Sequence, residues 1–273
     1  MRSSSSARFV HVLWLVPVLV LYGAGLLLPL AITVKRAFAL GAAGWLDLLG
    51  NSLFTGAALN TAIDSAEITV IAVVLAYSLA AAIWRSGPAV RTILTTLVVI
   101  AFLTTVLVKI VAFNALLRDN GVLNTMLLSL GVISEPWHLF PGRPAMVIGM
   151  IQFAVPFAIF PILGVMLRLD GRIERAAESL GASPWRVFIH VVLPLTLPGV
   201  IAAALLVFVI CTGFYVIPAT LGTPRDQLLA NVIAIYALQL VDFNVASAVA
   251  MVLVVVVGIL TVFYQRAERA THS

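Results

Sequence analysis

Long apolar stretches separated by short polar segments run along the whole chain. A helix needs about 20 mostly apolar residues to cross the hydrocarbon core of a bilayer. Several stretches meet this requirement, so the pattern predicts an all-α integral membrane protein with about six transmembrane helices. The predicted spans cover residues 9–34, 68–84 with an upstream extension to about residue 60, 92–117, 144–167, about 194–215, and 243–265.

Two weaker segments are expected at the membrane surface rather than across it. Residues 48–63 are uncharged, but their glycines, asparagines and serine favour a loop or interfacial helix on the outer face. Residues 227–241 form a short apolar segment of the same kind. Ala37-Phe38-Ala39 resembles a signal-peptidase site, but the apolar stretch before it is far longer than the 7–15 residues of a signal peptide. We therefore expect no cleavage there.

Composition supports the membrane class. Hydrophobic residues make up 62% of the 273 residues and charged residues only 10%, whereas soluble domains carry about 25% charged residues. The chain is expected to form one transmembrane domain over residues 1–273, with a core at about 58–265 and a cytoplasmic loop at about 168–192. The net charge of +5 is not gathered into a basic cluster of the kind that binds nucleic acid.

The distribution of Lys and Arg predicts the orientation, because cytoplasmic loops carry an excess of these residues. With the N-terminus inside, ten basic residues fall on the cytoplasmic side, five fall outside, and Lys109 lies within a span. Both termini are therefore expected in the cytoplasm, as is the 168–190 loop. The inner set is Arg2, Arg8, Arg85, Arg91, Arg168, Arg172, Arg175, Arg186, Arg266 and Arg269, and the outer set is Lys35, Arg36, Arg118, Arg143 and Arg225.

The 168–190 loop has the pattern of two short helices joined by a turn. Apolar residues at 173, 176, 177 and 180 recur at helical spacing and give one apolar face. Gly181 can end the first helix in a left-handed conformation. Ser183 is a natural N-cap and Pro184 a natural first residue for the second helix. Periodicity alone is equally consistent with an ordinary loop between spans.

This loop resembles the EAA signature of ABC-importer permeases. The residues that carry the resemblance are Ala176, Ala177, Gly181, Ala182, Ser183, Pro184, Trp185 and Phe188, followed by Leu193-Pro194 and Leu197-Pro198-Gly199. The resemblance implies a type I ABC importer permease fold in which residues 174–185 couple the permease to its ATPase. The glutamate that precedes the alanines in the family is Arg175 here, and Glu174 stands one position earlier.

Other segments are similar to the spermidine/putrescine type within that family. They are residues 118–124 (Arg-Asp-Asn-Gly-Val-Leu-Asn), 215–222 (Tyr-Val-Ile-Pro-Ala-Thr-Leu-Gly) and 231–233 (Asn-Val-Ile). The resemblance implies polyamine import from periplasm to cytoplasm across a bacterial inner membrane. It also implies a second permease subunit, most simply in a heterodimer, two ATP-binding subunits and an external substrate-binding protein. Importers of phosphonates, carboxylated amines or other organic ions remain open, as does a secondary transporter or channel.

The sequence offers no candidate for covalent chemistry. It lacks the G-x-x-x-x-G-K-[ST] pattern that cradles nucleotide phosphates, so ATP and Mg²⁺ are expected on a partner chain. It also lacks H-E-x-x-H and C-x-x-C patterns, and its histidines are scattered. We expect no catalytic or metal-binding residues. A membrane enzyme is the weakest alternative.

Three charged residues near membrane depth are candidates for the substrate pathway. Asp64 and Glu67 lie three residues apart and share one helical face near the outer end of the second span. Lys109 interrupts the third span in its outer half. One hypothesis is that the carboxylates attract a cationic substrate. The alternative is that Lys109 neutralises one of them in a structural ion pair.

Three uncharged polar or aromatic residues complete the candidate set. Phe214 and Tyr215 end the fifth span, where their rings could attract amines by cation–π contacts or could form an aromatic belt at the interface. Asn114 could bind substrate or cap its own helix. Cys211 is expected to be a small core residue rather than a reactive thiol.

Overall fold

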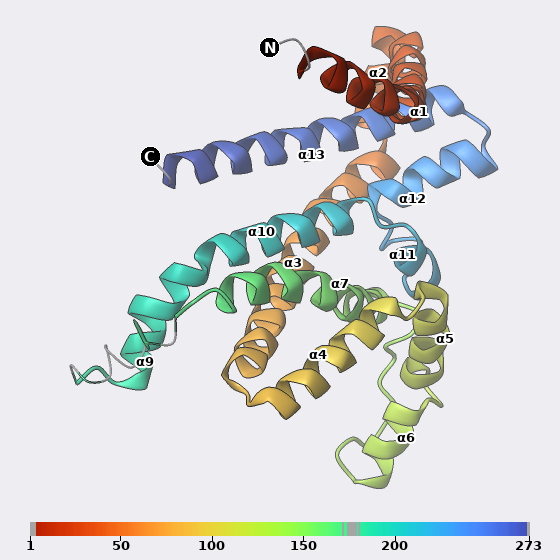
Figure 1. The fold of residues 1–273 in the computed structure, drawn as a ribbon. Helices are drawn as coiled ribbons and strands as arrows, with labels where there is room; N and C mark the ends of the chain where they lie inside the picture. Colours follow the sequence, from red (N-terminus) through yellow and green to blue (C-terminus); the bar gives the residue numbers. More distant parts are fainter. Residues whose placement is uncertain (1–3, 171, 174–178, 180, 272–273) are drawn as a thin grey trace.

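Helices follow one another along the described chain in the computed structural model (Figure 1). The structure describes residues 4–170, 172–173, 179 and 181–271, and it describes side chains between residues 20 and 262 of that set. The elements are α1 Ser4–Ala39, α2 Gly41–Gly50, α3 Ser52–Arg85, α4 Pro88–Leu103, α5 Val106–Leu117, α6 Val122–Ser129, α7 Arg143–Met166, α9 Pro184–Val187, the π-helical turn η1 Phe188–Val192, α10 Leu193–Thr212, α11 Val216–Leu221, α12 Leu229–Ala234, the π-helical turn η2 Ile235–Gln239, and α13 Phe243–Thr271.

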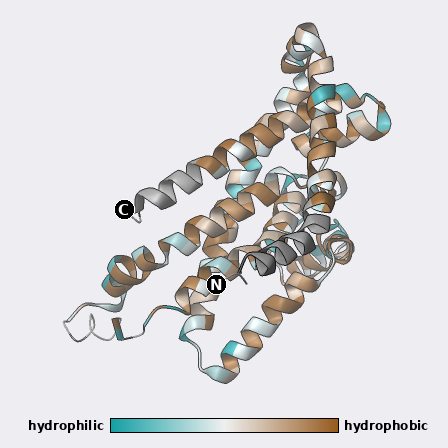
Figure 2. Cartoon of the chain, turned by 45° about the horizontal axis from the view of Figure 1, so that its top comes forward, coloured by the Kyte–Doolittle hydropathy of each residue, from teal (hydrophilic) through white to brown (hydrophobic). Residues whose placement is uncertain are grey.

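The expectation of about six membrane spans is confirmed. Five described helices are long and apolar enough to cross a bilayer, and the bent pair that begins with α4 could supply a sixth. Figure 2 shows hydrophobic residues along most of these helices and hydrophilic residues concentrated toward their ends and connecting turns. Apolar faces directed away from the protein are the surfaces expected against lipid.

The prediction that residues 48–63 form a loop or an interfacial helix separate from the second span is wrong. Residues from Ser52 onward belong to α3, one continuous helix of 34 residues. Asn51 begins it as an N-cap, because its side-chain Oδ1 accepts a hydrogen bond from the Leu53 amide at 2.8 Å. Asn60 and Thr61 within α3 bond to a distant loop, so these polar residues mark contacts between elements rather than a break in the helix.

The predicted third span is not a single straight helix. The chain leaves α4 after Leu103 and begins α5 at Val106, and the bent pair turns through 97°. Thr104 and Thr105 adopt extended backbone angles at this break. The Thr104 hydroxyl donates to the Ile100 carbonyl at 2.8 Å, a local bond that competes with continuation of the helix.

The fifth span begins ten residues earlier than predicted. Residues Pro184–Thr212 form one helical stretch in which α9, η1 and α10 follow without interruption. Pro194 does not end this helix, because the π-helical turn η1 directly precedes it. A proline ring clashes with the carbonyl four residues earlier in a regular α-helix, and the wider π turn relieves that clash.

The core is built from α3, α7 and α10, which pack against one another. Small residues allow close approach, as is common between helices in membranes. The clearest case is Gly199 on α10, where an added Cβ would lie 2.9 Å from the Pro161 carbonyl oxygen and 3.2 Å from the Ile162 Cα of α7. A second apolar cluster joins parts of α2, α3, α12 and α13, and α1 packs along α13. In Figure 1, α9 lies at one end of this core and α5, α6 and α11 lie at the other.

Candidate functional site

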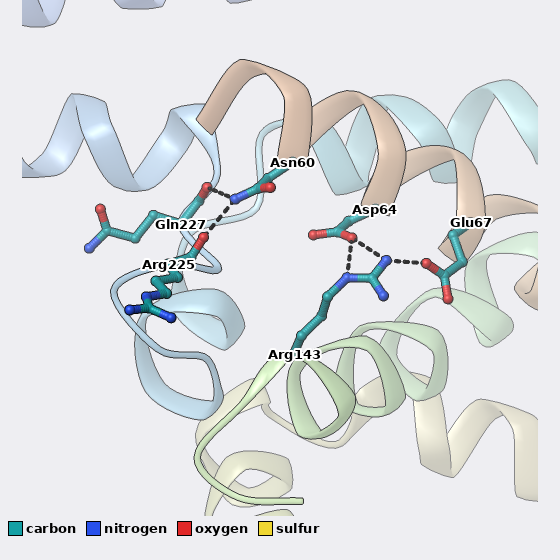
Figure 3. Close-up of polar contacts among 6 residues, drawn as sticks. All are labelled: Asn60, Asp64, Glu67, Arg143, Arg225 and Gln227. Carbon is teal, nitrogen blue, oxygen red and sulfur yellow. Dashed lines mark hydrogen bonds and ion pairs between the residues drawn. The ribbon is translucent and has the colours of Figure 1, made fainter. Parts of the chain in front are cut away.

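Two carboxylates on α3 and one guanidinium on α7 form an ion cluster, here called the Arg143 cluster (Figure 3). Asp64 and Glu67 project from the same side of α3 toward Arg143, the first residue of α7. Arg143 Nε and Nη2 lie 2.9 and 2.7 Å from Asp64 Oδ1, and Nη2 also donates to Glu67 Oε2. The Asp64 side chain is only 3% exposed, whereas those of Glu67 and Arg143 are 37% and 46% exposed.

The hypothesis that Lys109 neutralises one of these carboxylates is therefore wrong. Arg143 pairs with both carboxylates instead, because the start of α7 packs directly against this part of α3. Asp64 lies 21 residues from Arg85, the last residue of α3, which corresponds to about 31 Å along an ideal helix. That length is close to the thickness of a hydrocarbon core, so with Arg85 at one membrane boundary the Arg143 cluster is expected near the other.

The neighbouring turns of α3 hold the loop between α11 and α12. Asn60 Nδ2 donates to the Arg225 and Gln227 carbonyls at 2.8 and 3.3 Å, and the side chains of these two residues point away from α3 (Figure 3). The Thr61 hydroxyl accepts from the Leu229 amide at 2.8 Å. One stretch of α3 thus fastens both α7 and the α11–α12 loop.

The second candidate group lies where α5, α7 and α10 meet. Lys109 on α5 is 7% exposed, and its Nζ lies 5.4 Å from the centroid of the Phe153 ring on α7. Phe153 in turn packs 4.5 Å, centroid to centroid, from Phe214 at the end of α10. Among the residues whose side chains are described, Lys109 makes no ion pair with a carboxylate. The structure therefore brings Lys109 and Phe214 together through a ring that sequence analysis did not single out.

The remaining pathway candidates do not join this group. Tyr215 is exposed, and it borders an apolar pocket of about 630 Å³ formed with α12 and α13. Its carbonyl accepts a hydrogen bond from Asn231 Nδ2 at 3.1 Å. Asn114 is half-buried in the last turn of α5. Its side-chain amide makes no hydrogen bond to another described residue. Cys211 is buried in the core, as expected.

The segment similar to the EAA signature is described from Gly181 onward. Gly181 has φ +83°, which confirms the left-handed conformation expected at the turn. Ser183 occupies the N-cap position of α9 and Pro184 follows in the first turn, also as expected, although the Ser183 side chain accepts no capping bond. Trp185 is 68% exposed. Glu174, Arg175, Ala176 and Ala177 lie outside the described residues.

The loop that follows α5 is held by one buried side chain. Asn124 on α6 donates from Nδ2 to the Arg118 and Trp137 carbonyls at 3.2 and 2.9 Å, and its Oδ1 accepts from the Trp137 amide at 2.9 Å. This asparagine therefore ties α6 to both flanking segments. Asn124 is the last residue of the 118–124 segment that is similar to spermidine/putrescine permeases, and these bonds give it a structural role.

The family model for the binding-protein-dependent transport system inner membrane component matches residues 68–269. The chain belongs to this family. It is 34% identical over 221 residues to the spermidine/putrescine transport system permease protein PotB of Haemophilus influenzae, covering 81% of this chain and 77% of that protein. It is 32% identical over 205 residues to PotB of Escherichia coli K12, covering 75% of this chain and 74% of that protein.

The fold is similar to that of a solved ABC transporter. A chain from the crystal structure of a bacterial alginate ABC transporter in complex with alginate pentasaccharide-bound periplasmic protein superposes with a TM-score of 0.83 at 16% identity, covering 97% of this chain and 96% of that one.

These similarities establish the class of the protein. It is the permease subunit of an ABC importer, and it is a transport subunit rather than an enzyme. The structural similarity independently confirms the fold of an ABC-transporter permease. The match begins at Ile68 within α3 and includes α9, η1 and α10.

Sequence reasoning missed three residues that organise the sites. Sequence analysis counted Arg143 only among the basic residues outside the membrane. Its position directly before an apolar span could have marked it as a partner for a carboxylate at similar depth. Phe153 is one of several aromatic residues in an apolar helix, so its sequence does not single it out. Tyr77 contacts α10 only because α3 packs against α10, which the sequence does not reveal.

Proposed function

We propose that this permease forms part of a polyamine importer that moves spermidine or putrescine from the periplasm to the cytoplasm. The observation that carries the proposal is the 34% identity over 221 residues to a spermidine/putrescine permease, which covers most of both chains. The permease spans a bacterial inner membrane with both termini in the cytoplasm. The excess of Lys and Arg in the loops assigned to that side supports this orientation.

The proposed assembly contains a second permease subunit, two ATP-binding subunits and an external substrate-binding protein. ATP and Mg²⁺ bind the ATP-binding subunits, and ATP hydrolysis there supplies the energy for import. Residues 174–185 of this chain dock on one of these subunits. The glycine turn at Gly181 and the exposed ring of Trp185 support this role, because together they present a defined, accessible surface.

The polyamine pathway is proposed to pass the aromatic residues in the middle of α7 and just after α10. Aromatic rings attract ammonium groups by about 0.5–2 kcal/mol each. Phe153 and Phe214 lie in contact, and the exposed Tyr215 follows directly. The carboxylates of the Arg143 cluster are already engaged by a guanidinium, so we assign them a structural role rather than a substrate-binding role.

Uptake of labelled putrescine and spermidine tests the proposal. A host strain that lacks this gene is expected to lose most ATP-dependent uptake and to regain it from a plasmid copy. The strain must first be cleared of other polyamine importers, so that redundancy does not hide the effect. Unchanged uptake in such a strain would rule out polyamines as the substrate and leave the importer class intact.

A second candidate is an importer of an anionic or carboxylated small solute. The observation that favours it is the buried Lys109, which lies against a ring and has no carboxylate partner among the described side chains. A buried cation of this kind attracts an anion and repels an amine. It is therefore the feature of the pathway that fits a polyamine least well.

Replacement of Lys109 separates the two candidates. Lys109→Met keeps the length of the side chain and removes its charge, and Lys109→Arg keeps the charge. A polyamine importer is expected to retain or increase putrescine uptake in Lys109→Met. An importer of anions is expected to lose about tenfold or more of its uptake in Lys109→Met, the effect of one lost charged contact, but not in Lys109→Arg. A fall in putrescine uptake in Lys109→Met alone would contradict the repulsive role given to this lysine.

A further inference from the structure

A π-helical turn connects the ATPase-side helix α9 to the membrane helix α10. This turn, η1, spans Phe188–Val192, and the Leu193 amide bonds back to the Phe188 carbonyl five residues earlier. A π turn is rare and often occurs at functional sites. Along the chain, η1 is the connection between α9 and the core helix α10.

One side chain of α3 contacts the first residue of this turn and a residue of α10 that bonds to the last residue of the turn. The ring of Tyr77 packs edge-on against Phe188, the first residue of η1, with centroids 5.8 Å apart. The Tyr77 hydroxyl lies 3.0 Å from Thr196 Oγ1 on α10. Thr196 Oγ1 donates to the carbonyl of Val192, the last residue of η1, at 2.8 Å. Since that bond uses the threonine proton, Tyr77 is the donor to Thr196.

Phe188 also contacts an exposed aromatic residue of α9. Trp185 on α9 stacks on Phe188 with centroids 5.6 Å apart and rings inclined by 21°. The chain of contacts therefore runs from the exposed Trp185 through Phe188 to Tyr77 in the core. Thr196 is fully buried, so water does not replace the Tyr77 hydroxyl as its donor.

We propose that Tyr77 is a positioning residue that clamps η1 and makes α9 and α3 move as one body during the transport cycle. The proposal rests on the docking of residues 174–185 on an ATP-binding subunit, and it adds the path by which that movement enters the membrane core. The ring fixes the beginning of the π turn and the hydroxyl, through Thr196, fixes its end. Without this clamp, η1 absorbs the movement of α9 by shifting its own hydrogen bonds.

The clamp is tested in the full complex, purified with its partner subunits and placed in proteoliposomes. Tyr77→Phe keeps the ring and removes the hydroxyl, and Thr196→Val removes the acceptor. Each variant is expected to lower the solute imported per ATP hydrolysed by about three- to tenfold, the effect of one hydrogen bond, while ATP hydrolysis continues. Labelled putrescine is the transported probe. Tyr22→Phe, which makes the same change on an exposed residue of α1, is the control and is expected to have no effect.

A distance measurement tests the same point without any knowledge of the substrate. Spin labels are attached at cysteines introduced for Arg186 on α9 and for Leu59, which is exposed on α3, because the one native cysteine, Cys211, is buried. In the otherwise unaltered complex, this distance is expected to stay constant when ATP is added. In Tyr77→Phe it is expected to change, since α9 then moves without α3.

The outcomes separate this proposal from the proposed function. If the unaltered complex imports no putrescine, the polyamine assignment fails, but the distance measurement still applies because it needs only ATP and the partner subunits. If the ATP-binding subunits do not co-purify, the docking role of residues 174–185 fails. The clamp itself is overturned if Tyr77→Phe gives the same response to ATP as the unaltered complex. A variant with both Tyr77→Phe and Thr196→Val leaves no unpaired buried hydroxyl, so it keeps the test valid if either single variant fails to fold.

Discussion

Replacement of Arg143 by methionine is expected to lower the free energy of unfolding by about 2–3 kcal/mol. The change leaves the carboxylate of Asp64 buried between α3 and α7 without the two hydrogen bonds that the guanidinium donates. Breaking a buried ion pair costs about 3–5 kcal/mol, and we expect a smaller loss here because Arg143 itself is half-exposed. Thermal unfolding of the purified permease in mild detergent measures the effect.

Two further variants identify the cause of that loss. Arg225→Met makes the same chemical change in a side chain that points away from α3, and it is expected to leave stability unchanged (Figure 3). Combining Arg143→Met with Asp64→Leu removes the orphaned carboxylate and is expected to restore most of the stability. If Arg143→Met is as stable as the unaltered protein, the Arg143 cluster does not hold α3 to α7. The carboxylates would then become candidates for substrate binding again.

The features that sequence analysis predicted correctly are those set by local chemistry. The length of each apolar span is set by the thickness of the bilayer, so each span can be recognised from its own residues without knowledge of its neighbours. The left-handed turn at Gly181 and the start of α9 at Ser183 and Pro184 likewise depend on a few adjacent residues. The resemblance to ABC-importer permeases rests partly on this same local pattern.

The features that sequence analysis missed depend on contacts between distant segments. Asn60 suggested a loop because its bonding partners, the carbonyls of Arg225 and Gln227, are more than 160 positions away in the sequence. The carboxylates on α3 were correctly placed on one face, but the choice of Arg143 over Lys109 as their partner depends on how α7 packs against α3. The same holds for Phe153, which joins Lys109 to Phe214 only in the folded protein.

The Arg143 cluster and the Tyr77 clamp lie on the same helix. Asp64 ties the first half of α3 to α7, and Tyr77, thirteen positions further along, ties its second half to α10. A movement that enters α3 at Tyr77 therefore reaches the start of α7 through Arg143 without any flexible link. This connection gives a physical route from the end of the core at α9, where we propose that the ATP-binding subunit docks, to the opposite end.

Replacement of Gly181 by valine is expected to abolish ATP-driven uptake. Gly181 has φ +83°, a conformation that costs a residue with a side chain about 1–2 kcal/mol and a β-branched residue more. An added Cβ would meet no atom within 4 Å among the described residues, so the strain comes from the backbone and not from crowding. To relieve it, the turn must change shape, which moves α9 and Trp185 relative to the surface that we propose the ATP-binding subunit docks on. Uptake of labelled solute and ATP hydrolysis by the reconstituted complex are both measured.

The chain provides a matched control for backbone strain. Gly131 has φ +68° and also has no neighbour within 4 Å of an added Cβ, but it lies in the loop after α6, at the end of the molecule opposite α9 (Figure 1). Gly131→Val is expected to lower thermal stability by a similar amount and to leave uptake intact. Gly181→Asn, whose side chain tolerates the left-handed region, is expected to retain most activity. Equal loss of uptake in Gly131→Val and Gly181→Val would show that strain alone inactivates the permease. Normal uptake in Gly181→Val would remove the turn from the coupling path.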